Sequence, residues 1–182
     1  MIRFQQRSLI ISVNNFYYIK SRGDKSMEYS LKLNGKQNAL RMKNLLISKN
    51  LKVSYKKNEI NDEYDLGNGL KINIYDNHFP PNHPAASYET MFQEEDFIYE
   101  QTISYELKNN QHYEICYKMM YEISFAILES LQVSGIFYHT SGEEIFFYAE
   151  GTYTFNITYL EMLQTNYGEL LEHIEYENFM ER

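Results

Sequence analysis

The 182-residue sequence has few of the residues that cross-link small proteins or build membrane spans. It contains one cysteine, Cys116, three prolines and no tryptophan. A single cysteine excludes an intramolecular disulfide framework and any zinc site built from several cysteines. No apolar run approaches the ~20 residues of a membrane-spanning helix. The run at 9–11 is also shorter than the ~7–15-residue apolar region of a signal peptide. These absences predict a soluble, cytoplasmic protein that does not bind membranes.

Catalytic and ligand-binding signatures are missing as well. The sequence has no Gly-x-Ser-x-Gly elbow, no glycine-rich phosphate loop and no His-Glu-x-x-His pair. Cys116 lies on the apolar stripe of a predicted helix, where a free cysteine usually behaves as a small hydrophobic residue. We therefore expect no enzymatic activity, no catalytic residue, no cofactor and no metal ion.

Two histidine-containing segments support an alternative, a small hydrolase or phosphoesterase. The tripeptide His139-Thr140-Ser141 resembles half of the paired His-x-Ser/Thr signature of two-histidine phosphoesterases. That family needs a second copy so that one histidine acts as base and the other as acid, and no other histidine here completes the pair. The segment 76–84 contributes Asp76, His78 and His83, which could supply a carboxylate and two imidazoles to a metal. Their spacing matches no recognised metal motif.

The composition is that of a globular protein with a sizeable core. Apolar residues make up 43% and charged residues 23% of the chain, which includes 18 tyrosines and 11 phenylalanines. A chain of this length buries roughly 70% of its unfolded surface without cross-links. Tyrosine joins an apolar ring to a hydrogen-bonding hydroxyl, so it suits both the edge of a core and a binding face.

Hydrophobic periodicity places the strands and helices. Alternating apolar residues predict strands at 27–33, 51–55, 70–74 and 97–107, and a meander over 135–139, 144–149 and 152–157. A hairpin is expected over 8–20 and short helices over 39–47 and 87–95. The strongest helix spans 111–132, and a capping box at Thr158–Glu161 opens a terminal helix that reaches about 174, with Gly168 as its weak point.

These elements predict one α+β domain over residues 1–182. Its mostly antiparallel sheet of seven or eight strands is packed by the 111–132 helix and the C-terminal helix. Residues 1–77 form a basic half of net charge +7, and residues 78–182 carry a net charge of −15. The connector 76–84 holds all three prolines and is predicted to be a stiff joint between the basic half and an acidic half, 85–182.

The acidic half is the best indication of function. Its candidate partner-binding residues are Glu94, Glu95, Asp96, Glu143, Glu144, Glu169, Glu172 and Glu175. On a continuous terminal helix the last three, spaced three apart, would lie close together. The negative electrostatic potential of these acids would attract a basic protein partner, and exposed tyrosines would anchor it. We therefore predict an intracellular inhibitor or immunity-type protein.

The charge balance also bears on other partners. A net charge of −8 opposes the binding of nucleic acid, because the phosphates would be repelled. The opposite charges of the two halves are consistent with two arrangements: a homo-oligomer, in which the basic half of one copy contacts the acidic half of another, or packing of the two halves within one molecule.

Overall fold

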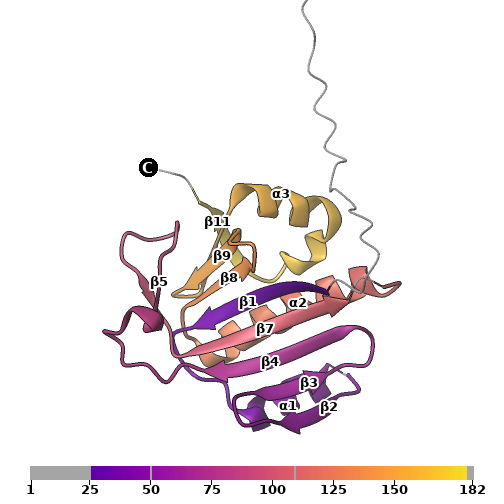
Figure 1. Ribbon diagram of the computed structural model, residues 1–182. Coiled ribbons are helices and arrows are strands. Elements are labelled where there is room, and N and C mark those ends of the chain that lie inside the picture. Colours follow the sequence, from indigo (N-terminus) through magenta and orange to yellow (C-terminus); the bar gives the residue numbers. More distant parts are fainter. Residues whose placement is uncertain (1–25, 50, 109, 180–182) are drawn as a thin grey trace, which may run out of the picture.

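Nine strands form one sheet in the computed structural model, which describes residues 26–49, 51–108 and 110–179 (Figure 1). Their order across the sheet is β11-β10-β9-β8-β1-β7-β4-β3-β2. The bounds are β1 (Ser26–Leu33), β2 (Ser54–Lys57), β3 (Asp62–Asp65), β4 (Leu70–Asp76), β7 (Gln101–Lys108), β8 (Gly135–His139), β9 (Glu144–Ala149), β10 (Thr152–Phe155) and β11 (Glu175–Asn178). Neighbouring strands are antiparallel, except that β10 and β11 are parallel.

The described residues also contain three α-helices and a small second sheet. The helices are α1 (Ala39–Ser48), α2 (Tyr113–Leu131) and α3 (Ile157–Asn166). Two 3₁₀ turns are η1 (Pro84–Ala86) and η2 (Gly168–Leu170), and β5 (Ser87–Tyr88) pairs with β6 (Phe97–Ile98). The predicted α+β class is confirmed, although the sheet is larger than expected. Within the described ranges, no helix is long and apolar enough to cross a membrane.

Helix α2 lies at the centre of the core because its apolar residues recur at helical spacing. Cys116, Met120, Ile123 and Ile127 are fully buried in one cluster with the sheet. Figure 1 shows this helix running behind β1 and β7. Ser124 on the helix donates a hydrogen bond of 2.9 Å to the hydroxyl of a buried tyrosine on β7. The predicted 111–132 helix is therefore confirmed.

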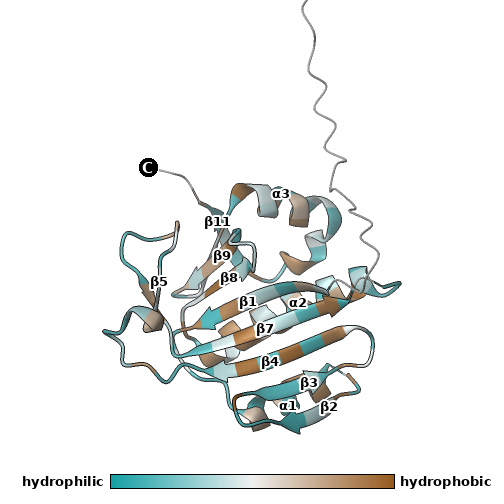
Figure 2. Ribbon diagram, in the orientation of Figure 1, coloured by the Kyte–Doolittle hydropathy of each residue, from teal (hydrophilic) through white to brown (hydrophobic). Residues whose placement is uncertain are grey.

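The two faces of the sheet differ in how they are covered. On β7, Ile103 and Tyr105 point to the helix side and are fully buried, while the alternate residues Thr102 and Ser104 are half-buried on the other face. Figure 2 shows this alternation of brown and teal along β1, β7 and β4, whereas β2 and β3 are mostly teal. We call the side opposite α2 the open face. Aromatic rings of segment 84–99 cover part of it, where they contact side chains of β1, β8 and β9.

Two local predictions are wrong. Residues 87–95 do not form a helix, because β5 begins at Ser87 and a turn follows it. The terminal helix ends at Asn166, and the chain passes through η2 before it forms β11. Glu169, Glu172 and Glu175 therefore do not share a helical face. The hairpin predicted over 8–20 lies outside the described residues.

The connector at 76–84 does not divide the chain into two bodies. Strand β1 belongs to the basic half of the sequence but lies between β7 and β8, which belong to the acidic half. The connector is also tied back to the sheet, because the side-chain amide of Asn77 donates to Ala85 O at 3.2 Å and to Tyr99 O at 3.1 Å. The basic and acidic halves of the sequence therefore contribute neighbouring strands to one sheet.

Candidate functional site

One end of the sheet carries lysines on its edge strand, which lie opposite the acids Glu63 and Asp62 of β3. Its edge strand β2 is exposed along its whole length and carries Lys56 and Lys57. Helix α1 lies beside it and adds exposed Arg41 and Lys43. The helix is held there partly by a hydrogen bond of 3.1 Å from the Tyr64 hydroxyl, on β3, to the first turn of α1.

The opposite end is acidic, and its edge strand is β11. All four residues of β11 are exposed, and Glu175 and Glu177 project from the same face. The strand is positioned by parallel pairing with β10 and by a hydrogen bond of 3.1 Å from Thr154 Oγ1 to a Glu177 carboxylate oxygen. Tyr176, on the other face, packs edge-on against Phe155. Within the described part of the chain, β2 and β11 are the two edges of the sheet.

The backbone N–H and C=O groups that point to the free edge of β11 can be assigned from its pairing with β10. The N–H of Phe179 donates to Phe155 O at 2.8 Å, so this residue faces β10. Because backbone groups alternate along a strand, Glu177 and Glu175 also face β10, while Tyr176 and Asn178 direct their N–H and C=O outward. The edge therefore combines outward hydrogen-bonding groups with two carboxylates.

The loop between β5 and β6 brings further acids to this end. Phe92 stacks on Phe147 of β9 and contacts the ring of Phe179, which follows β11, at a centroid distance of 5.3 Å. The exposed residues Glu94, Glu95 and Asp96 follow in the same loop.

The other predicted acids are placed separately. Glu143 lies at the β8–β9 turn and accepts a hydrogen bond of 2.9 Å from the Tyr159 hydroxyl. Glu169, in η2, pairs with Lys118 of α2 at 2.7 Å, and Glu172 is exposed in the following turn. The structure therefore places Glu175 on the edge strand and Glu169 in an ion pair with a helix.

Glu144 is buried and not part of an exposed acidic surface. The residue is 8% exposed, and its carboxylate accepts hydrogen bonds from Thr90 Oγ1 at 2.8 Å and from the backbone N–H of Met91 at 3.0 Å. A buried carboxylate is tolerated when it is hydrogen-bonded in this way. The prediction that Glu144 contacts a partner is corrected: it anchors the segment that covers the open face.

Ten of the sixteen tyrosines in the described ranges are buried in the core or packed against it. Tyr105, Tyr121 and Tyr153 are among the largest fully buried side chains. Burial raises the pKa of the Tyr121 hydroxyl well above its ordinary value, because the interior disfavours the charged phenolate. At the sheet edges the tyrosines are open, with Tyr176 on β11 38% exposed and Tyr55 on β2 43% exposed.

Two of the three histidines that suggested a hydrolase, His139 and His83, make hydrogen bonds within turns. Ser141 Oγ lies 2.6 Å from His139 Nδ1 and 3.4 Å from a Glu143 carboxylate oxygen, and the backbone N–H of Ser141 also donates to His139 Nδ1. In a catalytic triad the carboxylate orients the imidazole, whereas here it contacts the hydroxyl. His83 Nδ1 caps η1 by accepting from Ala85 N at 3.0 Å.

Lys32 is a buried lysine surrounded by tyrosine rings, which the sequence did not predict. Lys32, on the open face of β1, is 9% exposed, and its ammonium lies 3.6 Å from the centre of the Tyr99 ring. The rings of Tyr88 and Tyr138 are 5.5 and 5.9 Å away. Burial lowers the pKa of Lys32 to about 8, although the ring contacts favour its charged form. The alternating pattern at 27–33 indicates a strand but does not show that segment 84–99 covers the polar face on which Lys32 lies.

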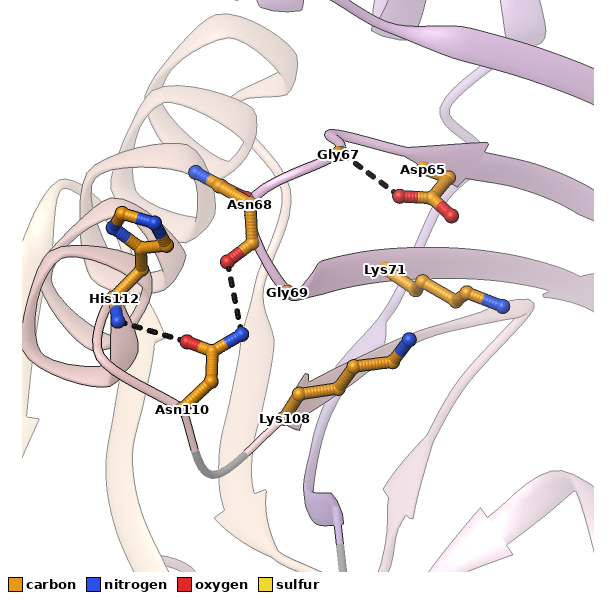
Figure 3. Close-up of a pocket in the computed structure, with 8 residues that line it drawn as sticks. All are labelled: Asp65, Gly67, Asn68, Gly69, Lys71, Lys108, Asn110 and His112. Atoms are coloured by element: carbon orange, nitrogen blue, oxygen red, sulfur yellow. Dashed lines mark hydrogen bonds between the residues drawn. The ribbon is translucent and has the colours of Figure 1, made fainter. Parts of the chain in front are cut away.

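A small surface pocket lies where the β3–β4 turn meets the loop before α2 (Figure 3). Its volume of about 220 Å³ is below the ~300–1,000 Å³ usual for ligand pockets. Asn110 spans it, donating to Asn68 O at 3.3 Å and accepting from the His112 N–H at 2.8 Å. The lysines Lys71 and Lys108 lie along its rim (Figure 3).

Within the residues described, no group of three or more His, Cys, Asp or Glu side chains is arranged to hold a metal ion. Comparison of the chain with protein-family models, curated proteins and solved structures found no match.

Proposed function

We propose that this protein binds a basic, extended segment of a partner protein by pairing that segment with β11. The observation that carries the proposal is a fully exposed edge strand with two glutamates on one face. Edge strands offer a row of backbone donors and acceptors to a peptide, and the side chains then select its sequence.

The surroundings of β11 favour a cationic segment. Glu175 and Glu177 would face lysine or arginine at alternate positions of an added strand, as cross-strand pairs of opposite charge do. The exposed acids of the β5–β6 loop lie toward the same end and strengthen the field that attracts such a segment. Tyr176 supplies a half-exposed ring for packing on the other face.

Binding of this kind suits an inhibitor or an immunity-type protein. A basic segment that a partner uses elsewhere, such as on an acidic target, is unavailable while it is paired with β11. Charge complementarity would mainly increase the rate of encounter and the selectivity for the partner.

A peptide titration tests the acidic edge. The probe is a labelled peptide of alternating Thr and Lys, and the control peptide has Glu in place of Lys. We expect the double variant Glu175→Lys/Glu177→Lys to bind the Lys peptide at least about tenfold more weakly than the wild type, because two attractive pairs become repulsive. The variant Glu28→Lys/Glu59→Lys carries the same charge change away from β11 and should bind close to the wild type. Equal loss in both variants would reduce the proposal to a general charge effect.

A proline substitution separates backbone pairing from charge alone. The N–H of Asn178 points away from β10, so Asn178→Pro removes an outward donor and keeps the glutamates. We expect weaker peptide binding in Asn178→Pro and unchanged binding in Lys57→Pro, the matched change on the opposite edge. Unimpaired binding by Asn178→Pro contradicts strand addition.

A further inference from the structure

The two free edges of the sheet complement each other in charge and in sequence pattern. Strand β2 reads Ser54-Tyr55-Lys56-Lys57, and β11 reads Glu175-Tyr176-Glu177-Asn178. Both are four residues long, exposed throughout, and stand at opposite ends of the sheet in the described chain. We infer that the basic segment that β11 accepts is β2 of a second copy, so that copies join head to tail into a continuous sheet. The inference rests on the proposed role of β11.

The topology sets the direction of the new strand pair. From β10 to β2 each strand is antiparallel to its neighbour, and β11 runs parallel to β10. Counted along the nine strands, β2 therefore runs opposite to β11. When β2 of one copy is placed beside β11 of another with both open faces on the same side, the junction is antiparallel. That is the commoner kind of pairing and the one that prevails elsewhere in this sheet.

In this junction one aromatic pair and one pair of opposite charge can form, on opposite faces of the sheet. On β2, Tyr55 packs against Tyr64, which is buried on the helix side, so Lys56 lies on the open face. On β11, Glu177 bonds Thr154, and Tyr176 packs on the helix side against Phe155. An antiparallel register with Tyr55 opposite Tyr176 places Lys56 opposite Glu175. Aromatic pairs and pairs of opposite charge are both favourable across strands.

The backbone groups are also available. The N–H of Asn58 bonds Asn61 O across the β2–β3 pair, so by alternation Tyr55 and Lys57 direct their backbone groups to the free edge. Tyr176 and Asn178 do the same on β11.

Symmetric pairing is disfavoured. Two copies of β2 would oppose lysines, and two copies of β11 would oppose glutamates, and like charges facing each other destabilise a strand pair. The contact is therefore heterologous, and such contacts generate a ring or an open chain of copies instead of a closed dimer.

Sedimentation velocity of the full chain over a wide range of concentration tests the inference. The wild type should form species larger than a dimer at high concentration, and added salt should weaken them because these edges are exposed. The variants Lys56→Glu/Lys57→Glu and Glu175→Lys/Glu177→Lys should each associate at least about tenfold more weakly. Charge-matched changes away from the edges, Lys71→Glu/Lys108→Glu and Glu28→Lys/Glu100→Lys, should leave association close to the wild type.

Mixing the two edge variants gives the decisive measurement. Each alone has two edges of one sign, but in a mixture the reversed β2 of one variant faces the reversed β11 of the other. The mixture should therefore regain association that neither variant shows alone. A monomeric wild type, or a mixture that stays monomeric, overturns the inference.

Peptide binding by β11 and self-association through β11 can be distinguished by comparing the two experiments. If the wild type remains monomeric yet binds the Lys peptide through β11, the second copy is the wrong partner and the proposed function stands. If it associates through these edges but does not bind the peptide, the edge is specific for β2 and the broader proposed function fails.

Discussion

The central strands and the edge strands of this sheet form for different reasons. In β1 and β7, apolar side chains alternate with polar ones, and the apolar set is buried against α2. In β2 and β11, none of the eight residues is buried. The central strands are therefore stabilised by side-chain burial, which contributes roughly 25 cal/mol per Å² of apolar surface. The edge strands are held by backbone pairing with a strand that already exists.

This difference assigns separate roles to the two regions. Substitution in the centre is expected to change the free energy of unfolding, whereas substitution at the edges is expected to change what the sheet binds. Substitutions in segment 84–99 are expected to have an intermediate effect on the free energy of unfolding, because a few specific contacts anchor this segment over the open face.

The largest effect is expected in the centre. Phe137 on β8 is fully buried and contacts the rings of Tyr29 and Phe146. Phe137→Ala should lower the free energy of unfolding by about 3–5 kcal/mol, because it removes buried surface and leaves a cavity. Urea denaturation measures it, with the exposed Phe79→Ala as control. A loss below about 1 kcal/mol would show that this site is not part of a packed core.

A smaller effect is expected at the anchor of segment 84–99. Glu144→Ala removes the acceptor of Thr90 Oγ1 and Met91 N–H, and should lower the free energy of unfolding by about 2 kcal/mol. Amide hydrogen exchange should also increase at Met91. Glu143→Ala changes an exposed neighbour and should stay within about 0.5 kcal/mol of the wild type. Equal effects in the two variants would contradict the anchoring role.

Lys32 gives a pH-dependent prediction. Burial lowers its pKa from 10.5 to about 8 in the folded protein. Between these values the unfolded chain binds the proton and the folded protein does not, so stability from this group rises with pH. Lys32→Met removes that dependence and should be more stable than the wild type by about 1 kcal/mol at pH 7.

This advantage of Lys32→Met should shrink as the pH approaches 10. Urea denaturation at several pH values measures it, with the exposed Lys43→Met as a flat control. A variant that is less stable at pH 7 would show that the contacts with the tyrosine rings outweigh burial of the charge.

The smallest effect on stability is expected at the edges. Lys56→Ala and Glu175→Ala should each change the free energy of unfolding by no more than about 0.5 kcal/mol, because both side chains are exposed. The same denaturation series measures them. A loss above about 1 kcal/mol in either would mean that the edge strand contributes to the core, and the contrast with Phe137 would weaken.

Sequence periodicity predicted the elements that bury an apolar face. The α2 helix, the strands of the β8–β10 meander and the α+β class follow from patterns that burial itself imposes. It did not predict β3 or β11, which read Asp62-Glu63-Tyr64-Asp65 and Glu175-Tyr176-Glu177-Asn178. Charged strands carry little hydrophobic signal, and a neighbouring backbone outside the local window decides whether they pair.

The sequence predicted the negative charge of the candidate site but not the positions of its residues in the fold. The sequence showed that acids dominate residues 78–182, but it placed Glu169, Glu172 and Glu175 on one helix and Glu144 on the surface. Gly168 favours an end to the helix, and Glu144 is buried only because segment 84–99 folds back over β9.

What the sequence by itself determined about this protein is local: a strong amphipathic helix, alternating strands, and two stretches of opposite charge. Only the tertiary structure decided that β1 crosses between β7 and β8, which merges the two stretches into one sheet, and that their charged strands stand at its opposite edges. The physical reason is that periodicity records which residues are buried, whereas strand order depends on long-range backbone pairing that side-chain patterns specify weakly.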